Sequence, residues 1–201
     1  MAVSDQGLSW GISKDQETKY TLDVNMTLLN STTSNSYDMS VVIDSVPDIP
    51  PNVTMIAEIP LPEVTLKFAN GTEFINIAGQ ALEGPFVMPI GNWSLMTDLI
   101  DAIFGNLTSN EFTWISDSSY WGYNITHDDV YPTIISFKSS RSDGVLSYMY
   151  VGADMGVNGE YEFTMQRLGS GLALDSTTLL IIGGGAVGLV VVVLVAFKLK
   201  R

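Results

Sequence analysis

Residues 20–28, YTLDVNMTL, alternate between apolar and polar side chains along their whole length. Every even-numbered position in this stretch is apolar, and every odd-numbered position is polar. Successive side chains of a β-strand point to opposite faces of the sheet, so this period of two predicts a strand with one buried and one solvated face. Such strands are typical of antiparallel sheets, in which one face packs on a core and the other meets water.

The same alternation recurs along the chain and predicts further strands. It is found at residues 37–43, 64–68, 133–138, 145–151 and 161–168. The last three are joined through Asp143-Gly144 and Asn158-Gly159, and Asn70-Gly71 is a dipeptide that favours tight hairpin turns. The proline-rich residues 47–62 are unsuited to a regular central strand, so we expect an edge strand or an extended loop there.

One helix is predicted over residues 93–104, where apolar side chains recur at three- and four-residue steps. They are Trp93, Met96, Leu99, Ile100, Ile103 and Phe104. Asn92 or Ser94 can cap the start of this helix, and Gly105 can cap its end. The predicted fold class is therefore mainly β (α+β), an antiparallel sheet covered by one amphipathic helix, with a two-sheet β-sandwich as the alternative.

The C-terminal region predicts a membrane anchor. Residues 179–197, LLIIGGGAVGLVVVVLVAF, carry no charge over nineteen positions, which is long enough for a helix to cross a hydrocarbon core about 30 Å thick. Lys198, Lys200 and Arg201 follow directly and indicate a cytoplasmic C-terminus. Gly184 and Gly188 form a GxxxG pair, which makes them candidates for dimerisation of two such helices.

Four regions follow from these signals. We expect a β-rich extracellular domain at residues 1–168, a short linker at 169–176, a transmembrane helix at 177–197 and a basic tail at 198–201. The first residues have neither a basic start nor an apolar core typical of an export signal, so we expect that signal to have been removed. The alternative is a tail-anchored protein whose domain stays in the cytosol.

Seven asparagines stand in the triplet Asn-x-Ser/Thr, the acceptor pattern for N-linked glycans, here called a sequon. They are Asn25, Asn30, Asn52, Asn70, Asn92, Asn106 and Asn124. With eleven asparagines and 36 Ser or Thr among 201 residues, composition alone predicts about two sequons. The excess predicts glycosylation and a domain outside the cytoplasm, with at least six of the seven side chains substantially exposed. The alternative is a polar β surface that generates the triplets by composition.

Charge and residue types exclude several function classes. The chain has no cysteine, which removes disulfides and thiolate chemistry. The region before the apolar segment holds 22 acidic and six basic residues, and this formal net charge of −16 makes nucleic acid a poor partner. His127 is the only histidine, so most hydrolase and metal constellations are missing. We expect no enzyme, no cofactor and no metal, including at Asp154, Asn158 and Glu160, whose spacing differs from that of a calcium-binding EF-hand loop.

Four stretches of the chain carry a resemblance to a known family. They are LSWGISKDQETKYTLDV (8–24), PIGNWSLMTDLI (89–100), SSRSDGVLSYMYV (139–151) and the glycine-rich anchor that ends in FKLKR (197–201). With them the chain resembles the small single-span surface proteins of archaea known as the choice-of-anchor S family, including those of Asgard lineages. The resemblance implies a location at the cell surface, and it implies no catalytic mechanism.

Two functions remain open from the sequence. The first is a non-enzymatic, membrane-anchored and N-glycosylated component of a cell coat or an adhesion surface, whose partners are the lipid bilayer, its glycans and other copies or other surface proteins. The second is a membrane-proximal carrier or sensor of a lipid or another apolar ligand. A filled core between the sheet and the helix favours the first function, and an open apolar cavity of several hundred Å³ there favours the second.

Overall fold

The computed structural model describes residues 4–28, 31–73, 86–105, 107, 111–127, 132–156 and 159–169. Within these residues the regular structure consists of strands, one α-helix and one short 3₁₀ turn. The strands are β1 (Glu17–Leu28), β2 (Ser31–Ser45), β3 (Glu63–Phe68), β4 (Phe112–Ser116), β5 (Tyr120–His127), β6 (Thr133–Ser140), β7 (Leu146–Asp154) and β8 (Glu160–Arg167). The helix is α1 (Trp93–Phe104), and the 3₁₀ turn is η1 (Ile56–Glu58).

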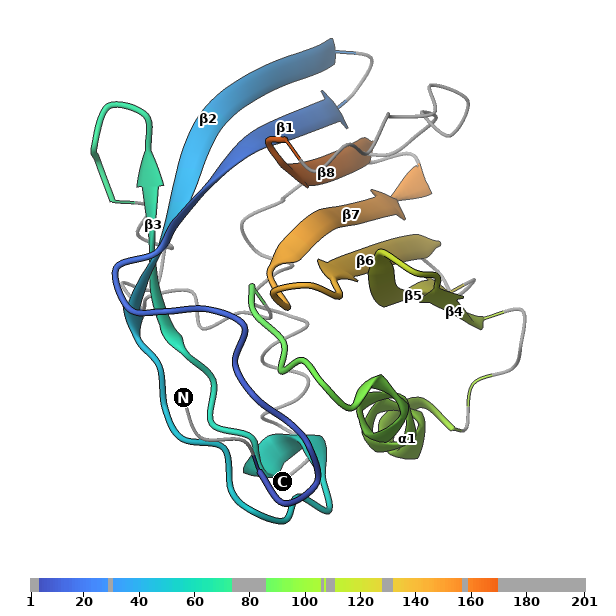
Figure 1. The fold of residues 1–201 in the computed structure, drawn as a ribbon. Coiled ribbons are helices and arrows are strands. Elements are labelled where there is room, and N and C mark those ends of the chain that lie inside the picture. The colour runs from blue at the N-terminus through green and yellow to red at the C-terminus, as the bar shows by residue number, and fades with distance from the viewer. Residues whose placement is uncertain are drawn as a thin grey trace.

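The strands form one eight-stranded antiparallel sheet in the order β3-β2-β1-β8-β7-β6-β5-β4 (Figure 1). β1 lies between β2 and β8, so the first and the last strand are neighbours. The predicted antiparallel sheet with one helix is confirmed for the described residues. The two-sheet sandwich is wrong, because backbone pairing runs without a break from β3 to β4.

The register of the strand pairs extends the alternation of residues 20–28 across the sheet. Leu22 is opposite Met165, and Met149, Phe137 and Tyr123 continue the same row through β7, β6 and β5. The neighbouring row on the other face is polar and consists of Asp23, Thr164, Tyr150, Ser136 and Asn124. Because residues that face each other across antiparallel strands share one face, the sheet has an apolar side and a polar side.

The apolar side is covered by α1 together with three irregular segments (Figure 1). The segments contribute Leu8, Trp10, Ile12, Val53, Ile59, Phe86, Val87 and Met88 to the core. The sequence led us to expect the helix as the only cover. Twelve residues make a helix about 18 Å long, whereas eight strands spaced about 4.8 Å apart span roughly 34 Å, so a single such helix leaves part of the sheet for other segments to cover.

The predicted helix is confirmed, including both of its ends. Asn92 caps it, since the Asn92 Oδ1 accepts a hydrogen bond of 3.1 Å from the Leu95 N–H, and Gly105 follows its last residue. The proline-rich residues 47–62 form an extended loop interrupted only by η1, as one of the two expectations for that stretch proposed. Neither β4 nor β5 lies in the ranges for which alternation predicts a strand. In β4, Ile115 directly follows Trp114 and breaks the alternation, and β5 begins with two adjacent aromatic residues, Tyr120 and Trp121.

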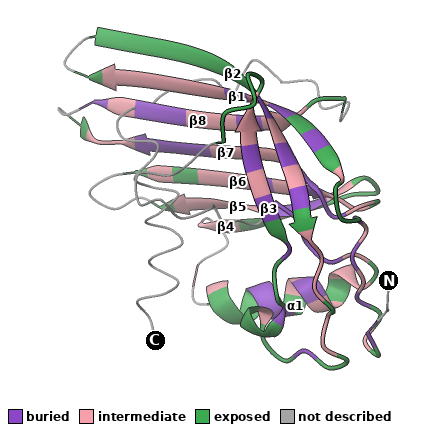
Figure 2. Cartoon of the chain, turned by 90° about the vertical axis from the view of Figure 1, so that its left-hand side faces the viewer, coloured by how far each residue is buried: buried purple, intermediate pink, exposed green. Residues whose placement is uncertain are grey.

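Burial changes along β2 (Figure 2). Its first eight residues, 31–38, are all exposed, whereas Met39, Val41 and Ile43 are buried. β3 pairs only with the second half of β2, from Met39 onward. The Ser- and Thr-rich first half is therefore solvated on both faces.

The described residues contain no helix that is long and apolar enough to cross a membrane. The predicted span at residues 177–197, with Gly184 and Gly188, lies outside the described residues, and so does the basic tail at 198–201.

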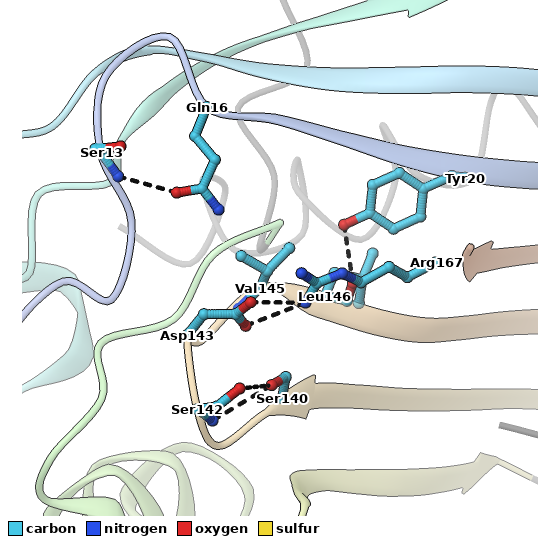
Figure 3. A network of polar contacts seen from close by, with 9 residues as sticks. All are labelled: Ser13, Gln16, Tyr20, Ser140, Ser142, Asp143, Val145, Leu146 and Arg167. Carbon is cyan, nitrogen blue, oxygen red and sulfur yellow. Dashed lines mark hydrogen bonds and ion pairs between the residues drawn. The ribbon is translucent and has the colours of Figure 1, made fainter. Parts of the chain in front are cut away.

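An ion pair fastens the turn between β6 and β7 to the end of β8 (Figure 3). Arg167 Nη1 lies 2.8 Å from Asp143 Oδ2 and 3.2 Å from Asp143 Oδ1. The same Oδ1 accepts a hydrogen bond of 3.0 Å from the Val145 N–H. One carboxylate thereby shapes the turn and binds the neighbouring strand.

This turn also receives the covering segment that precedes α1. The Met88 N–H donates to the Gly144 carbonyl at 2.9 Å, and the Leu146 N–H donates to the Phe86 carbonyl at 2.8 Å. Gly144 has a φ of +72°, and a Cβ at this position would lie 1.9 Å from the Met88 carbonyl oxygen. Only glycine permits this approach, because any side chain would collide with the backbone of the covering segment.

Two buried tyrosines provide a matched test of the core. The Tyr20 hydroxyl donates to the Leu146 carbonyl at 2.8 Å (Figure 3), whereas the equally buried Tyr161 hydroxyl has no hydrogen-bond partner in the described structure. We expect Tyr20→Phe to lower the free energy of unfolding by about 1–2 kcal/mol, because a buried hydrogen bond is lost. Tyr161→Phe removes an unsatisfied hydroxyl and should leave stability unchanged or slightly higher. Denaturant unfolding measures both, and equal losses in the two variants would contradict the assigned bonding.

Candidate functional site

Five of the seven sequon asparagines lie among the described residues, and they are distributed over strands, turns and the helix start. Asn52 and Asn70 are exposed, whereas Asn25, Asn92 and Asn124 are half-buried. Asn30 and Asn106 lie outside the described residues. None of the five described side chains is fully buried, but only Asn52 and Asn70 are exposed, so the prediction of at least six exposed side chains among the seven is not met.

Asn70 lies at the tip of the turn that follows β3. Its Oδ1 accepts a hydrogen bond of 2.9 Å from the Thr72 N–H, which closes a side-chain turn over Gly71. Gly71 has a φ of +82°, and a Cβ placed there would have no atom within 4 Å. Within the described residues, the space beside Gly71 is therefore open.

Asn52 lies in the proline-rich loop before η1. The next residue, Val53, is buried and anchored by Gln6, whose side-chain amide donates to the Val53 carbonyl at 3.1 Å and accepts from the Val53 N–H at 2.5 Å. Because Val53 points inward, Asn52 is held on the outside of the loop.

Asn25 belongs to a chain of hydrogen bonds on the polar side of the sheet. Its Nδ2 donates to Glu162 Oε2 at 3.2 Å, and its Oδ1 accepts from the Ser34 hydroxyl at 2.5 Å. The Tyr150 hydroxyl donates to the other oxygen of Glu162 at 3.2 Å and lies over Gly152. Glu162 is only 7% exposed, so its carboxylate depends on these donors.

Asn92 and Asn124 also use their amides within the fold. Asn92 caps α1 and donates from Nδ2 to the Gln6 carbonyl at 2.9 Å, which joins the helix to the N-terminal segment. Asn124 Nδ2 lies 3.4 Å from the Thr113 hydroxyl across β4 and β5. The sequence predicts Asn124 only as a glycan acceptor, whereas it predicts Asn92 both as a glycan acceptor and as a possible helix cap. It gives no indication of Gln6 or Glu162 as their partners or as partners of Asn25, since the sequence neighbours of these residues carry no signal of a long-range contact.

Aromatic side chains fill the space between α1 and strands β4 to β6. Trp121 is fully buried, and its ring centroid lies 5.3 Å from those of both Trp93 and Trp114. Tyr123 stacks on Phe137 with a centroid distance of 5.5 Å. From the sequence, the aromatic residues around 120–131 are predicted to lie in a core and not on the surface. The positions of Trp121 and Tyr123 agree with this prediction.

The indole groups of this interior are bonded to the helix. Trp121 Nε1 donates to the Thr97 hydroxyl at 3.0 Å, and Trp114 Nε1 donates to Asp101 Oδ1 at 3.1 Å. Arg141 lies over the Trp93 ring, 5.6 Å from its centroid, at the rim. The interface between α1 and strands β4 to β6 is therefore a packed and hydrogen-bonded core. Such packing disfavours the binding of an apolar ligand between the helix and the sheet.

A surface pocket of about 460 Å³ lies at the other end of the sheet, over β1, β2 and β3. Its lining includes Lys19, Asp38, Lys67 and Leu168, as well as Glu17. Lys19 and Lys67 share one row, because both face Ser40 across the strands. The two positive and two negative side chains give this pocket no net charge, and its lining also includes the apolar residues Met39, Phe68, Ala69 and Leu168.

The described residues contain no group of three or more His, Asp or Glu side chains placed to hold a metal ion. His127 is exposed at the end of β5, and the adjacent Asp128 and Asp129 lie outside the described residues. Asp154 accepts a hydrogen bond from the Gly156 N–H at 2.5 Å and faces Glu160 across β7 and β8, whereas Asn158 lies outside the described residues.

The two faces of α1 provide a test of the filled interior. Met96 is completely buried against the sheet, and we expect Met96→Ala to cost about 2–5 kcal/mol of unfolding free energy through the cavity it leaves. Ile103 is 38% exposed, and Ile103→Ala should cost less than about 1 kcal/mol. Denaturant unfolding compares the two. A loss below 1 kcal/mol in Met96→Ala would show that the interface is loosely filled, as a ligand cavity would be.

Alkaline pH provides a second test of the same interior. Burial raises the pKa of Tyr123 to about 12 from its ordinary value of 10.0. Since the folded pKa lies above the unfolded one, this stabilisation is complete below pH 10 and is lost as the pH rises from 10 to about 12. We expect Tyr123→Phe to flatten the decline of stability over this window, measured by denaturant unfolding at each pH. An unchanged decline would contradict the burial of this hydroxyl.

Comparison with known proteins gives no information about the function of this chain. No protein-family model, no curated protein and no solved structure matches this chain. The resemblance to archaeal single-span surface proteins therefore stays a prediction.

Proposed function

We propose that this chain is a non-enzymatic, membrane-anchored and N-glycosylated surface protein that contributes to a cell coat or to adhesion. The observation that carries the proposal is the open position of Asn52 and Asn70, each in a sequon and each exposed on a loop or turn. An attached glycan needs an outward-pointing side chain with free space beyond it.

Two further features support a surface role. The packed aromatic interior between α1 and β4 to β6 gives no support to the alternative, a carrier of a lipid or another apolar ligand. The acidic composition, with a formal net charge of −13 for the whole chain, favours solubility and disfavours binding to nucleic acid.

The proposed arrangement places residues 1–168 outside the cell and the basic residues 198–201 inside, with the apolar segment 177–197 as the anchor. Other copies of the chain or other surface proteins are the proposed protein partners. Asgard-like archaea are the proposed source class, on the resemblance alone.

Accessibility to protease on intact cells tests the topology. With an epitope tag at the C-terminus, external protease should digest the β-rich domain and leave a short tagged fragment inside the membrane, because the bilayer protects only the anchor and the tail. Lysed cells serve as the control, in which the tag is lost as well. Protection of the whole domain until lysis would overturn the proposal in favour of a cytosolic, tail-anchored protein.

A further inference from the structure

N-linked attachment places a specific demand on the asparagine amide. In the transfer, the bond between the sugar C1 and a phosphate oxygen of a polyprenyl-phosphate-linked oligosaccharide breaks, and a C1–Nδ2 bond forms. The amide loses one proton and the phosphate leaves with the bonding electrons. One hydrogen remains on Nδ2, so the folded protein must leave room for a sugar at that nitrogen and tolerate the loss of one donor.

Asn70 meets this demand. Its Oδ1 holds the Thr72 N–H, and within the described structure its Nδ2 makes no hydrogen bond. The residue is exposed, and no atom of the described residues lies within 4 Å of a Cβ placed on Gly71. A sugar at this nitrogen therefore breaks no contact among the described residues.

Asn52 meets it as well. The residue is exposed, and the described structure shows no hydrogen bond at its side chain. Its neighbours hold the loop instead: Val53 is fixed by Gln6, and the Thr54 N–H donates to Glu58 Oε2 at 2.6 Å. The loop therefore keeps its shape with or without a sugar on Asn52.

Asn25 fails the demand. Its Nδ2 donates to a carboxylate that is only 7% exposed, and its Oδ1 is held by Ser34. A sugar at this nitrogen would have to lie over β8 and β2, where Glu162 and Ser34 already contact the amide. Moving the amide would leave the Glu162 carboxylate with the Tyr150 hydroxyl as its remaining bonded donor among the described contacts.

Asn92 fails it for a different reason. Its amide group joins two backbones, since Oδ1 accepts from the Leu95 N–H and Nδ2 donates to the Gln6 carbonyl. The N-terminal segment lies directly against it, because a Cβ placed on Gly7 would be 4.0 Å from the Asn92 Cβ. The half-buried cap has a structural task that a sugar would obstruct.

We propose that Asn52 and Asn70 are the glycan acceptors among these four asparagines, and that Asn25 and Asn92 remain unmodified because their amides hold the fold together. This inference rests on the proposed function, since it presupposes that the domain meets a glycosylation pathway. Asn124 belongs to neither group, because it is half-buried and has a single long contact to Thr113.

The test uses the full chain expressed in its native membrane, with glycopeptide mass spectrometry at each site and thermal unfolding of the purified protein. Asn70→Gln and Asn52→Gln should each remove the mass of one glycan and leave Tm within about 1 °C, since surface changes away from bonded groups have small effects. Asn25→Gln and Asn92→Gln should leave the mass at all other sites unchanged and lower Tm by about 3–6 °C, because each breaks buried or capping hydrogen bonds.

Matched variants separate the sequon from the amide. Thr27→Val and Ser94→Ala destroy the sequons of Asn25 and Asn92 while leaving both asparagines in place. Each should have the glycan mass of the unaltered protein. The Tm of each should also lie closer to the Tm of the unaltered protein than the Tm of the corresponding Asn→Gln variant does. Thr72→Val should remove the same glycan mass as Asn70→Gln.

The outcomes distinguish this inference from the proposed function. A glycan on Asn25 or Asn92, or glycans on Asn30 or Asn106 with Asn52 and Asn70 unmodified, would overturn the division of sites and leave a glycosylated surface protein intact. Absence of glycan from every asparagine would overturn both. Glycans on Asn52 and Asn70 with bare Asn25 and Asn92, together with the two different Tm responses, would establish the division.

Discussion

Backbone pairing of β1 with both β2 and β8 is the constraint on which the rest of the molecule depends. The register places Leu22 opposite Tyr37 on one side and opposite Met165 on the other, so the parity of residues 20–28 passes into both halves of the sheet. A shift of one residue would turn the apolar row toward water and the polar row inward. β1, the strand with the clearest alternation, therefore pairs directly with β8, although the two strands lie far apart in the sequence.

A sheet of eight strands creates more apolar surface than the only helix among the described residues can cover. The remaining cover comes from irregular segments, which have to satisfy their own backbone groups. The turn between β6 and β7 provides part of this, since Gly144 and Leu146 exchange hydrogen bonds with residues 86–88. The Arg167–Asp143 ion pair then holds that turn against β8. Packing and backbone bonding thus meet at a single turn, where only a glycine allows the two backbones to approach.

The protein uses asparagine for two opposed purposes. Asn25 supplies a hydrogen to a buried carboxylate, and Asn92 caps a helix on the covering layer, so both amides belong to the fold. Asn70 and Asn52 lie on turns and loops in which neighbouring residues carry the hydrogen bonds. The same triplet therefore marks positions of very different chemical availability.

The sequence by itself determined the class of fold, because the period of two and the helical spacing of residues 93–104 are local consequences of backbone geometry. It also determined the sequons, the apolar segment at residues 179–197 and the absence of cysteine, which depend on residue identity alone. The strand order, the cover formed by residues 8–12 and 53–59, and the pairing of Glu162 with Asn25 were decided only by the tertiary structure. Asn25 and Asn70 both lie in sequons. They differ because the Asn25 amide is bonded to Glu162, more than a hundred residues away in the sequence, whereas the exposed Asn70 side chain is bonded only to the nearby Thr72.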